Sequence, residues 1–394
     1  MEQIRIYSDA PCVTTPKVSA EIDLEALKSN YRALASFAPR ARHIAVVKAD
    51  AYGHTSALCV PALLEVGCDF FAVSCIEEAI AVKKICLELS KDAEVLILGY
   101  TDPAMAFSLA EYGIIQSVVS EEHAESLASF AEDNGLRVRV HIAIDTGMNR
   151  IGLKAASDAD CVAVADEIAA LATREGLAVE GMFTHFSRAD EDFEASDGEN
   201  FTRAQFEKFD LIRKILLADG IKLFCHVSNS AATLRFPEFD LDGVRLGIVL
   251  YGASPSQYAK APVSPVMSFK TVVSRVHTIK KGEVVGYGGT YLAESDGIIA
   301  TLPIGYADGF IRAFSGAFVT VHTEMGDVKA RVVGRICMDQ CMIDVSGALV
   351  KVGDTVTVFG IDPIDITRLA QLASTIEYEV LCLVSARVPR IAKG

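Results

Sequence analysis

The 394-residue sequence lacks the features that mark several broad classes of protein. No apolar run reaches the roughly 20 residues that a membrane-spanning helix requires, so no membrane partner is expected. There is no Arg/Lys-rich tail or stripe, and 52 acidic residues outnumber 37 basic ones, which gives a formal net charge of −15. Binding to the phosphate backbone of DNA or RNA is therefore not expected either.

Disulfide and metal-binding patterns are also missing. The ten cysteines are spread from Cys12 to Cys382 without a Cys-x-x-Cys pair, so we interpret them as small buried residues of a reducing compartment. The eight histidines form neither His-x-x-x-His nor His-Glu-x-x-His, which predicts no dedicated metal site. The start, MEQIRIYSDAPCVTT, lacks the basic head and apolar stretch of a secretory signal, and the expected location is the cytoplasm.

Short β-rich runs alternate with longer amphipathic stretches from about residue 40 to residue 255, which is typical of βα units. Eight such runs favour a closed (β/α)8 TIM-type barrel, with an open doubly wound sheet as the alternative. The expected strands are His43–Lys48, Phe70–Ser74, Glu94–Gly99, Ile114–Val119, Arg137–Asp145, Ala178–Phe186, Leu223–Ser228 and Val244–Tyr251.

The pattern changes after Pro262, where strand-like runs separated by turns follow one another. We expect an α/β protein with the barrel in residues 1–262 and a C-terminal mostly-β domain in residues 263–394. Residues 1–20 are ambiguous and are candidates for pairing with the β domain. The expected strands of that domain are Phe269–Thr278, Gly297–Leu302, Phe318–His322, Lys329–Val333, Met342–Val345 and Thr355–Phe359, and the one clear helix is Ile366–Ala373.

Reactive side chains fall at the carboxyl ends of the expected barrel strands, where barrel enzymes place their catalytic groups. They are Lys48, Arg150, His185, Ser230 and Arg245. The set is rich in hydrogen-bond donors and poor in acids, so it suits an anionic small molecule. A lysine that can form a Schiff base beside a phosphate site suggests pyridoxal phosphate, and aldolase chemistry on a sugar phosphate is the competing interpretation.

Each of these residues also has a purely structural interpretation. The alternatives are a solvated Lys48, a core His185, the ion pairs Arg150–Asp145 and Arg245–Asp242, and a Ser230 that caps the following helix. Their common position at one end of the barrel favours the functional interpretation.

Several motifs, in this order along nearly the whole chain, resemble those of the alanine racemases. Any one of them is weak, but the ordered set is specific. The motifs are Val46-Val47-Lys48-Ala49-Asp50-Ala51-Tyr52-Gly53-His54, Asp145-Thr146-Gly147-Met148-x-Arg150, Thr184-His185-Phe186, Asn229-Ser230-Ala231-Ala232, Arg245-x-Gly247-Ile248, Gly286-Tyr287-Gly288, Gly305-Tyr306-Ala307-Asp308-Gly309, Met338-Asp339-Gln340, Tyr378-Glu379-Val380 and Arg387-Val388-Pro389-Arg390.

The resemblance implies a pyridoxal-phosphate-dependent isomerase that interconverts L- and D-alanine. It also implies a homodimer in which the β domain of one chain completes the active site of the other. Lys48 would hold the cofactor and act as one catalytic base, and Tyr287 of the second chain would be the other. The implied cofactor contacts are Tyr52, Ser230, Gly247, Ile248 and Tyr378 at the phosphate, His185 at the ring, Arg245 at the pyridine nitrogen and Arg150 at the phenolic oxygen, and Asn229 is a further cofactor-binding residue. The implied substrate contacts are Arg150, Tyr306, Met338 and Asp339.

The chemistry agrees with these roles. Racemisation removes the Cα proton from one face and returns a proton to the other, so it needs two bases on opposite faces, here Lys48 and Tyr287. An arginine is always protonated, and Arg245 at the pyridine nitrogen would disfavour protonation of that nitrogen. We therefore expect weaker electron withdrawal into the ring and suppression of transamination.

Two positions depart from the family pattern. Many members have a carbamate-modified lysine two residues before the Asp-Thr-Gly-Met motif, where its negative charge steadies the arginine, whereas this chain has Ala143. A bound anion such as chloride, or water, is expected to fill that place. Asn149 stands where glycine is common before Arg150, which puts the geometry of that loop in question.

Three other functions remain as alternatives. A serine or broad-specificity racemase is the nearest, although Tyr378 favours alanine. A barrel-type amino-acid decarboxylase would carry a carboxylate where this chain has Arg245. A non-catalytic pyridoxal-phosphate carrier would lack the second base, Tyr287.

Overall fold

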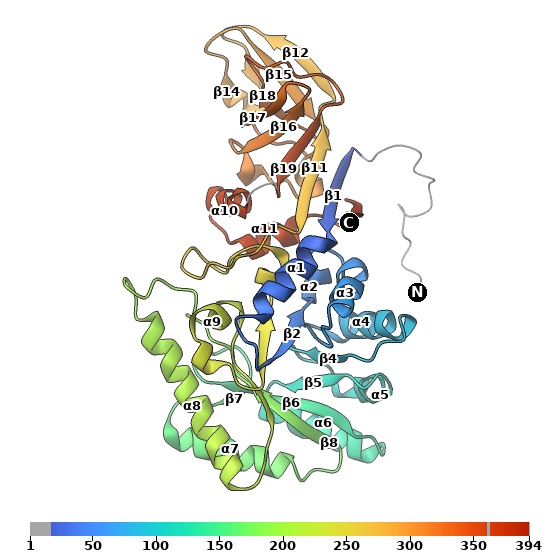
Figure 1. The fold of residues 1–394 in the computed structure, drawn as a ribbon, viewed down its shortest axis with the longest axis vertical. Helices are drawn as coiled ribbons and strands as arrows, with labels where there is room; N and C mark the ends of the chain where they lie inside the picture. Colours follow the sequence, from blue (N-terminus) through green and yellow to red (C-terminus); the bar gives the residue numbers. More distant parts are fainter. Residues whose placement is uncertain (1–16, 361–362, 394) are drawn as a thin grey trace. The chain divides into compact units, whose positions relative to one another are not determined.

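The computed structural model describes residues 17–360 and 363–393 of the chain. These residues divide into two compact units. One consists of residues 27–51 and 56–263, and it contains the barrel. The other consists of the residues up to 26, residues 52–55 and the residues from 264 on, and it contains the mostly-β domain (Figure 1).

A closed ring of eight parallel strands forms the core of the first unit. Hydrogen bonds join the strands in the order β5-β4-β3-β2-β10-β9-β8-β6, and β6 pairs with β5 to close the ring. The strands are β2 (Arg42–Val46), β3 (Phe70–Val73), β4 (Glu94–Ile97), β5 (Ile115–Val118), β6 (Val138–Asp145), β8 (Leu177–Phe183), β9 (Phe224–His226) and β10 (Gly243–Leu246). The predicted barrel is confirmed, and the open sheet is excluded.

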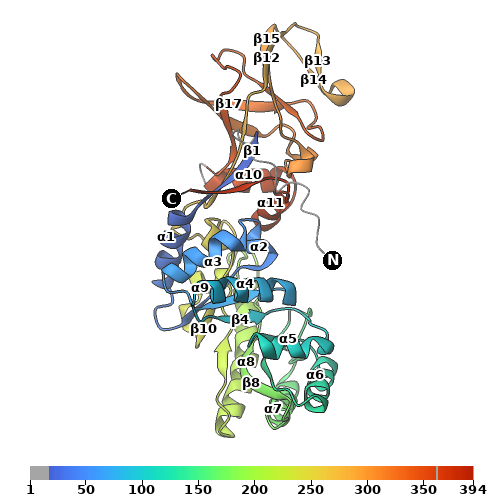
Figure 2. The same cartoon turned by 90° about the vertical axis from the view of Figure 1, so that its right-hand side faces the viewer.

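Helices lie around the outside of this ring (Figures 1 and 2). Two of them begin at serine caps: the hydroxyl of Ser120 accepts from the His123 amide, and that of Ser157 accepts from the Asp160 amide. The helices are α1 (Leu24–Ala35), α3 (Ser56–Glu65), α4 (Ile76–Glu88), α5 (Ala106–Glu111), α6 (Glu121–Asp133), α7 (Asp158–Leu171), α8 (Gly198–Ala218) and α9 (Ser230–Arg235), and the short strand β7 (Leu153–Lys154) extends the pairing of β6.

The barrel strands are nearly continuous apolar runs because both of their faces are covered. All residues of β3 and of β10 are buried. Register neighbours on adjacent strands share a face, so Ser117, His141 and Gly181 belong to one layer of the barrel. Polar residues in such a layer are exceptions that require an explanation.

The chain takes an unusual course directly after β2. We expected Lys48 to end this strand, but β2 ends at Val46, and Lys48 begins the turn α2 (Lys48–Tyr52). The four residues 49–52 have φ between 50° and 57°, a left-handed conformation that costs roughly 1–2 kcal/mol per residue. Side chains hold the turn in place, since Glu78 Oε1 accepts from the Ala49 amide at 2.7 Å and Asp50 Oδ1 accepts from the Ser56 amide at 2.7 Å.

A nine-stranded sheet forms the second unit, in the order β12-β15-β18-β17-β16-β19-β11-β1-β20. The strand β1 pairs antiparallel with β11 and parallel with β20, which places residues 18–23 in this sheet. Residues 1–16 lie outside the described part of the chain. The strands are β1 (Val18–Asp23), β11 (Met267–Val272), β12 (Arg275–Ile279), β15 (Gly297–Leu302), β16 (Phe318–Thr323), β17 (Gly326–Val333), β18 (Cys341–Asp344), β19 (Thr355–Phe359) and β20 (Arg390–Lys393).

Two expectations for this unit were wrong. The run Phe269–Thr278 is not one strand, because the chain leaves its pairing with β19 after Val272 and joins β15 as β12. The unit also has a second helix, α11 (Glu377–Leu383), beside the expected α10 (Pro363–Leu372). With seven residues and two glutamates in its first turn, α11 is too short for a helical period to be visible in the sequence.

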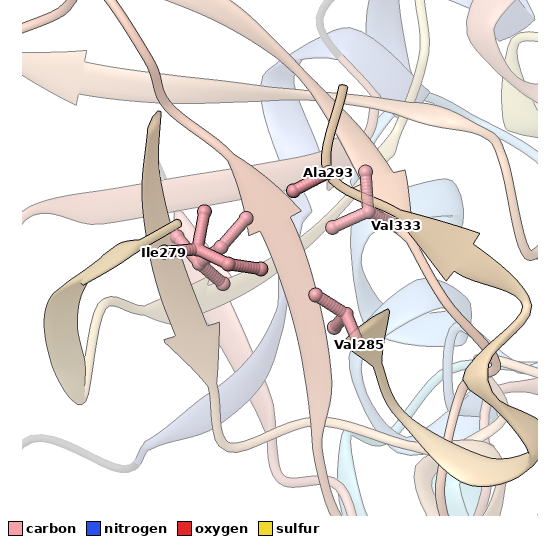
Figure 3. Packing of buried hydrophobic residues seen from close by; sticks show 5 residues of the cluster. Ile279, Val285, Ala293 and Val333 are labelled. Atoms are coloured by element: carbon pink, nitrogen blue, oxygen red, sulfur yellow. The ribbon is translucent and has the colours of Figure 1, made fainter. Parts of the chain in front are cut away.

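A small apolar cluster anchors the hairpin of β13 (Val284–Val285) and β14 (Tyr291–Leu292) to the sheet. Its buried members include Ile279, Val285, Ala293 and Val333 (Figure 3). Tyr287 lies in the turn between the two short strands. The cluster therefore fixes the base of the loop that presents this tyrosine.

Candidate active site

Three predicted residues line one cavity of about 240 Å³ at the carboxyl end of the barrel strands. Lys48 comes from the turn after β2, Arg150 from the loop after β6 and His185 from the residues after β8. Among the described residues that line the cavity, Asp145 is the single acid. The cavity is therefore rich in positive charge, as the sequence predicted.

His185 is held neutral in this environment. Burial, and then the positive charges of Arg245, Arg150 and Lys48, lower its pKa well below the usual value. A neutral imidazole can lie against an aromatic ring without adding a further charge to the cavity. The interpretation of His185 as an ordinary core histidine does not fit, because the ring forms part of the cavity wall.

The loop that carries Arg150 is organised by Asp145, the last residue of β6. One oxygen of this carboxylate, Oδ1, accepts from the Gly147 amide at 3.0 Å and from the Asn149 amide at 2.9 Å. Asn149 has φ of 55°, in the left-handed region that asparagine tolerates better than most residues. Asparagine thus adopts a backbone conformation suited to glycine, and Asp145 serves the loop rather than pairing with Arg150.

The departure at Ala143 lies in the same cavity. Ala143 is buried and lines the wall together with Arg150. A Cβ on the neighbouring Gly152 would come within 2.8 Å of the Ala143 carbonyl, so the backbone packs closely here. Alanine carries no charge, so residue 143 does not supply the negative charge that is common at this place in the family.

Arg245 is buried in the barrel interior, with 3% of its surface exposed. Its Nη2 donates to the Thr184 carbonyl at 2.7 Å and approaches His185 Nδ1 at 3.5 Å, and its Nη1 donates to His226 Nδ1 at 2.8 Å. Burial and the charge of Arg150 lower its pKa to about 9, which leaves it protonated at neutral pH. The alternative ion pair with Asp242 is wrong, because Asp242 Oδ2 accepts from the Cys225 amide at 2.8 Å.

Three of the residues predicted around the phosphate, Ser230, Gly247 and Ile248, lie just after the ends of β9 and β10. The Gly247 amide donates to Ser230 Oγ at 2.9 Å. Asn229, not Ser230, caps α9, since Asn229 Oδ1 accepts from the Ala232 amide at 3.0 Å. The capping interpretation of Ser230 is therefore wrong, and its hydroxyl is directed at the turn that contains Gly247 and Ile248.

Tyr52 and Tyr378 meet in the second unit. Their ring centroids are 6.1 Å apart. Tyr52 is buried, and burial together with the neighbouring Cys382 raises the pKa of its phenol. It is therefore a neutral hydroxyl that can donate a hydrogen bond.

An open groove of about 1090 Å³ on the β domain brings together Tyr287, Met338 and Asp339. Tyr306 is adjacent to them, because its amide donates to the Cys337 carbonyl at 3.1 Å. Arg387 holds Asp339, with Nη2 at 2.8 Å from Oδ1. The structure thus gathers Tyr287, the expected base for the site of a second chain, with three of the expected substrate contacts.

Sequence reasoning missed His226 and His141, which lie on the interior of β9 and β6 and are almost fully buried. His226 is the direct partner of Arg245 and also contacts His141. The signal was present: each is a polar residue flanked by apolar ones within a run interpreted as a barrel strand. It was not used because neither residue ends its expected run, Leu223–Ser228 or Arg137–Asp145.

The donor set suits pyridoxal phosphate. Lys48 offers an amine in a cavity with two arginines nearby, and Ser230 with the turn at Gly247 offers hydroxyl and backbone donors for a phosphate. Within the described residues, no group of three or more His, Cys, Asp or Glu side chains is arranged to hold a metal ion. The arrangement favours an organic, anionic cofactor.

Comparison with known proteins decides the family. Residues 22–255 match the N-terminal domain of alanine racemase, and residues 266–392 match its C-terminal domain. The chain belongs to the alanine racemase family. It is therefore an isomerase that acts on alanine with pyridoxal phosphate, which sets aside the aldolase, decarboxylase and carrier alternatives.

Racemases from distant organisms resemble the chain over nearly their full lengths. The alanine racemase of Clostridium perfringens (strain ATCC 13124) is 40% identical over 385 residues, with 95% of each chain covered. That of Methanococcus maripaludis is 39% identical, covering 94% of this chain and 97% of the relative.

Solved structures agree with the sequence matches. The alanine racemase of Clostridium difficile 630 has a TM-score of 0.86 at 34% identity, with 96% of each chain covered. The Bacillus anthracis enzyme with bound L-Ala-P has a TM-score of 0.84 at 31% identity, covering 98% of this chain and 96% of that one. In the described part of the chain, no helix combines the length and apolarity needed to cross a bilayer.

Proposed function

We propose that Lys48 and Tyr287 of a second copy are the two bases that interconvert L- and D-alanine. Bound pyridoxal phosphate supplies the electron sink that acidifies the Cα proton of the amino acid. Lys48 takes or returns this proton on one face, and Tyr287 does so on the other. The observation that carries the proposal is the pairing of a lysine-lined cavity in the barrel with an exposed tyrosine on a separate, groove-forming loop.

The other cavity residues orient the reacting groups. Arg150 is placed to bind the phenolic oxygen of the cofactor and the substrate carboxylate, and neutral His185 packs by the ring. Arg245 faces the pyridine nitrogen, where its positive charge disfavours protonation of that nitrogen. Each role is supported by the position of the residue in or directly below the cavity wall.

A set of neutral donors is proposed to hold the phosphate. Ser230 Oγ, which accepts from the Gly247 amide, and the amide of Ile248 in the same turn come from the barrel, while Tyr52 and Tyr378 contribute phenols. Asn229 fixes the start of α9 and donates through Nδ2 to the Phe186 carbonyl at 3.0 Å, so it positions Ser230. Neutral donors bind a dianion without the desolvation cost of further buried charges.

The exposed groove supports a homodimer with shared active sites. Tyr287 is 68% exposed and Met338 is 55% exposed, an unusual degree for bulky apolar side chains that lie side by side. Such a patch marks a surface that a partner covers. We propose that a second copy covers it with its barrel mouth, so that Tyr287, Tyr306, Met338 and Asp339 face the partner's substrate.

Three further points belong to the proposal. We propose residues 1–262 as the cofactor-binding part and residues 263–394 as the part that serves the partner. The boundary between the two compact units after residue 263 supports this division, although residues 52–55 and the residues up to 26 belong to the unit of the β domain. Tyr378 favours alanine over serine as the substrate. The nine described cysteines are all free thiols, which supports work in the reducing cytoplasm.

Exchange in D₂O tests the reaction. The purified protein incubated with either L- or D-alanine should place deuterium at Cα and bring both isomers to one ratio. Release of CO₂, or no exchange at all, would contradict racemisation. Lys48→Ala should lose both the activity and the yellow colour of the bound cofactor, and a yellow, active Lys48→Ala protein would refute the assignment of Lys48.

Mixing two inactive variants tests the shared site. Lys48→Ala and Tyr287→Phe should each be inactive or nearly so as homodimers. In a co-expressed mixture, half of the dimers are heterodimers with one intact site out of two, so about a quarter of the wild-type activity should return. A mixture that stays inactive would place both bases in one chain and overturn the shared site.

A further inference from the structure

Three buried polar side chains follow one another through the barrel interior below the cavity. Arg245 Nη1 lies 2.8 Å from His226 Nδ1, and His226 Nε2 lies 3.0 Å from His141 Nδ1. Their exposed fractions are 3%, 0% and 2%. Polar groups this deep in an apolar interior are costly unless each hydrogen bond is satisfied, so their contacts are specific.

The hydrogen bonds that join Arg245, His226 and His141 all run in one direction, from Arg245 toward His141. Burial lowers the pKa of His226 well below its usual value, and it lowers the pKa of His141 to about 3, so both rings are neutral. A neutral imidazole has one N–H and one bare nitrogen, and a guanidinium can only donate. His226 must therefore accept from Arg245 at Nδ1, carry its proton on Nε2 and donate that proton to Nδ1 of His141.

Packing leaves the two rings little freedom. Phe183 stacks on the His226 ring, with centroids 5.0 Å apart and planes 10° apart. The His141 ring lies against Gly181, its register neighbour on β8, and it fits there because glycine has no side chain. A Cβ at Gly181 would lie 2.6 Å from His141 Nε2, closer than any side chain can approach.

We propose that His141 is a positioning residue that acts through His226 on Arg245. By accepting the Nε2 proton of His226, it keeps the Nδ1 lone pair turned toward the guanidinium. With the opposite tautomer, an N–H would face Arg245 and push it away from its place below the cavity. This inference rests on the proposed role of Arg245 at the pyridine nitrogen, and it adds His141 and the space at Gly181 to the determinants of that role.

The expected consequence is a change in reaction outcome rather than only in rate. A guanidinium held at the pyridine nitrogen limits electron withdrawal into the ring and so suppresses transamination. If His141 no longer fixes His226, Arg245 loses its orientation, and transamination, which leaves the amino group of alanine on the cofactor and releases pyruvate, should occur more often per racemisation event. This ratio does not depend on the fraction of folded, active enzyme.

A matched pair of substitutions tests the proposal on the holoenzyme. Asparagine and leucine have the same shape, but only asparagine can place an oxygen near the position of His141 Nδ1. We expect His141→Leu to raise pyruvate formed per racemisation about 10-fold and His141→Asn to stay within about 2-fold of wild type, as one lost hydrogen bond implies. Equal ratios in the Leu and Asn variants would overturn the proposal.

Nitrogen-15 NMR of histidine-labelled protein gives a readout that is independent of turnover. The His226 signals are assigned by their absence in His226→Gln. Wild type and His141→Asn should show a protonated Nε2 and a bare Nδ1, and His141→Leu should show a mixture of tautomers. A His226 ring that remains wholly protonated at Nε2 in His141→Leu would overturn the proposal.

Three further variants distinguish a leucine variant that does not fold, a general effect of buried histidines and a wrong role for Arg245. Gly181→Ala displaces the His141 ring without changing it and should reproduce the effect of His141→Leu, which keeps the test valid if the leucine variant does not fold. His123→Leu removes a different buried histidine, one that contacts the Thr101 carbonyl, and should leave the product ratio unchanged. An unchanged ratio in Arg245→Gln would contradict the proposed function at Arg245, while the NMR comparison would still decide the tautomer.

Discussion

The amide of Gly247 donates a hydrogen bond to the hydroxyl of Ser230 at 2.9 Å, which ties the end of β10 to the start of α9. Because Asn229 already caps this helix, the Ser230 hydroxyl is not required there. The bond instead orders a turn whose donors converge near the ends of two neighbouring strands. This is the part of the barrel where phosphate groups commonly bind.

Replacement of Ser230 by alanine should weaken cofactor binding without unfolding the barrel. A hydrogen bond to a charged group contributes about 1.5–3 kcal/mol, so Kd for pyridoxal phosphate should rise roughly 10- to 100-fold. Titration of the apoprotein, followed by visible absorbance, measures the change. Ser129→Ala on the outer surface of α6 is the control, and an equal loss in that variant would contradict a specific role for Ser230.

The left-handed turn after Lys48 should respond to glycine in the opposite way to a normal helix. Ala49 is exposed with φ of 52°, so Ala49→Gly relieves steric strain and should raise the free energy of unfolding by about 1 kcal/mol. Ala81 is exposed within α4, and Ala81→Gly should lower it by about 1 kcal/mol. Urea unfolding compares the two; changes of the same sign would show that residues 49–52 are not left-handed in solution.

Glu167 on α7 should make the barrel less stable as pH rises. Burial, and then the charge of Glu121 and a hydrogen bond with it, raise its pKa from 4.5 to about 7. Between these values the folded state holds a proton that the unfolded chain has released, so the free energy of unfolding falls as pH increases through this window. Glu167→Gln removes the effect.

The variant and wild type should therefore be equally stable near pH 4.5, with the variant more stable at pH 8 by up to about 1 kcal/mol after solvent screening. Glu132 is the control of opposite sign, because its hydrogen bond to Arg174 lowers its pKa. Glu132→Gln should lose stability above pH 5. Thermal unfolding across this pH range measures both, and parallel curves for wild type and Glu167→Gln would contradict the raised pKa.

The sequence was sufficient for the barrel because apolar runs and their spacing are local properties. Each of the eight expected runs overlaps its strand, although Lys48 lies beyond the end of β2. That error has a physical cause: a left-handed turn of non-glycine residues has no composition signal, since Ala49 and Ala51 normally favour right-handed helices. The turn forms because Glu78, distant in sequence, and the nearby Ser56 bond to it.

The chemistry of the site was only partly visible. Residues at strand ends could be assigned because parallel strands bring their carboxyl ends together. His141 and His226 could not, because their meeting depends on the closure and stagger of the barrel, which decide the register that brings two interior side chains within 3.0 Å. Likewise, motifs alone did not show that Asn229, rather than Ser230, caps α9.

Ala143 leads to the last prediction. It lines the cavity beside Arg150, and the one acid in the described wall, Asp145, accepts two amides of its own loop. The cavity therefore has room for a small anion beside the positive charge of Arg150, and we expect chloride to occupy this place. Exchange of chloride for gluconate at constant ionic strength should lower kcat several-fold and make it recover when chloride returns. In Ala143→Glu, a carboxylate enters the cavity and should remove this dependence; a wild-type rate that is the same in both salts would mean that water, not an anion, fills the space beside Arg150.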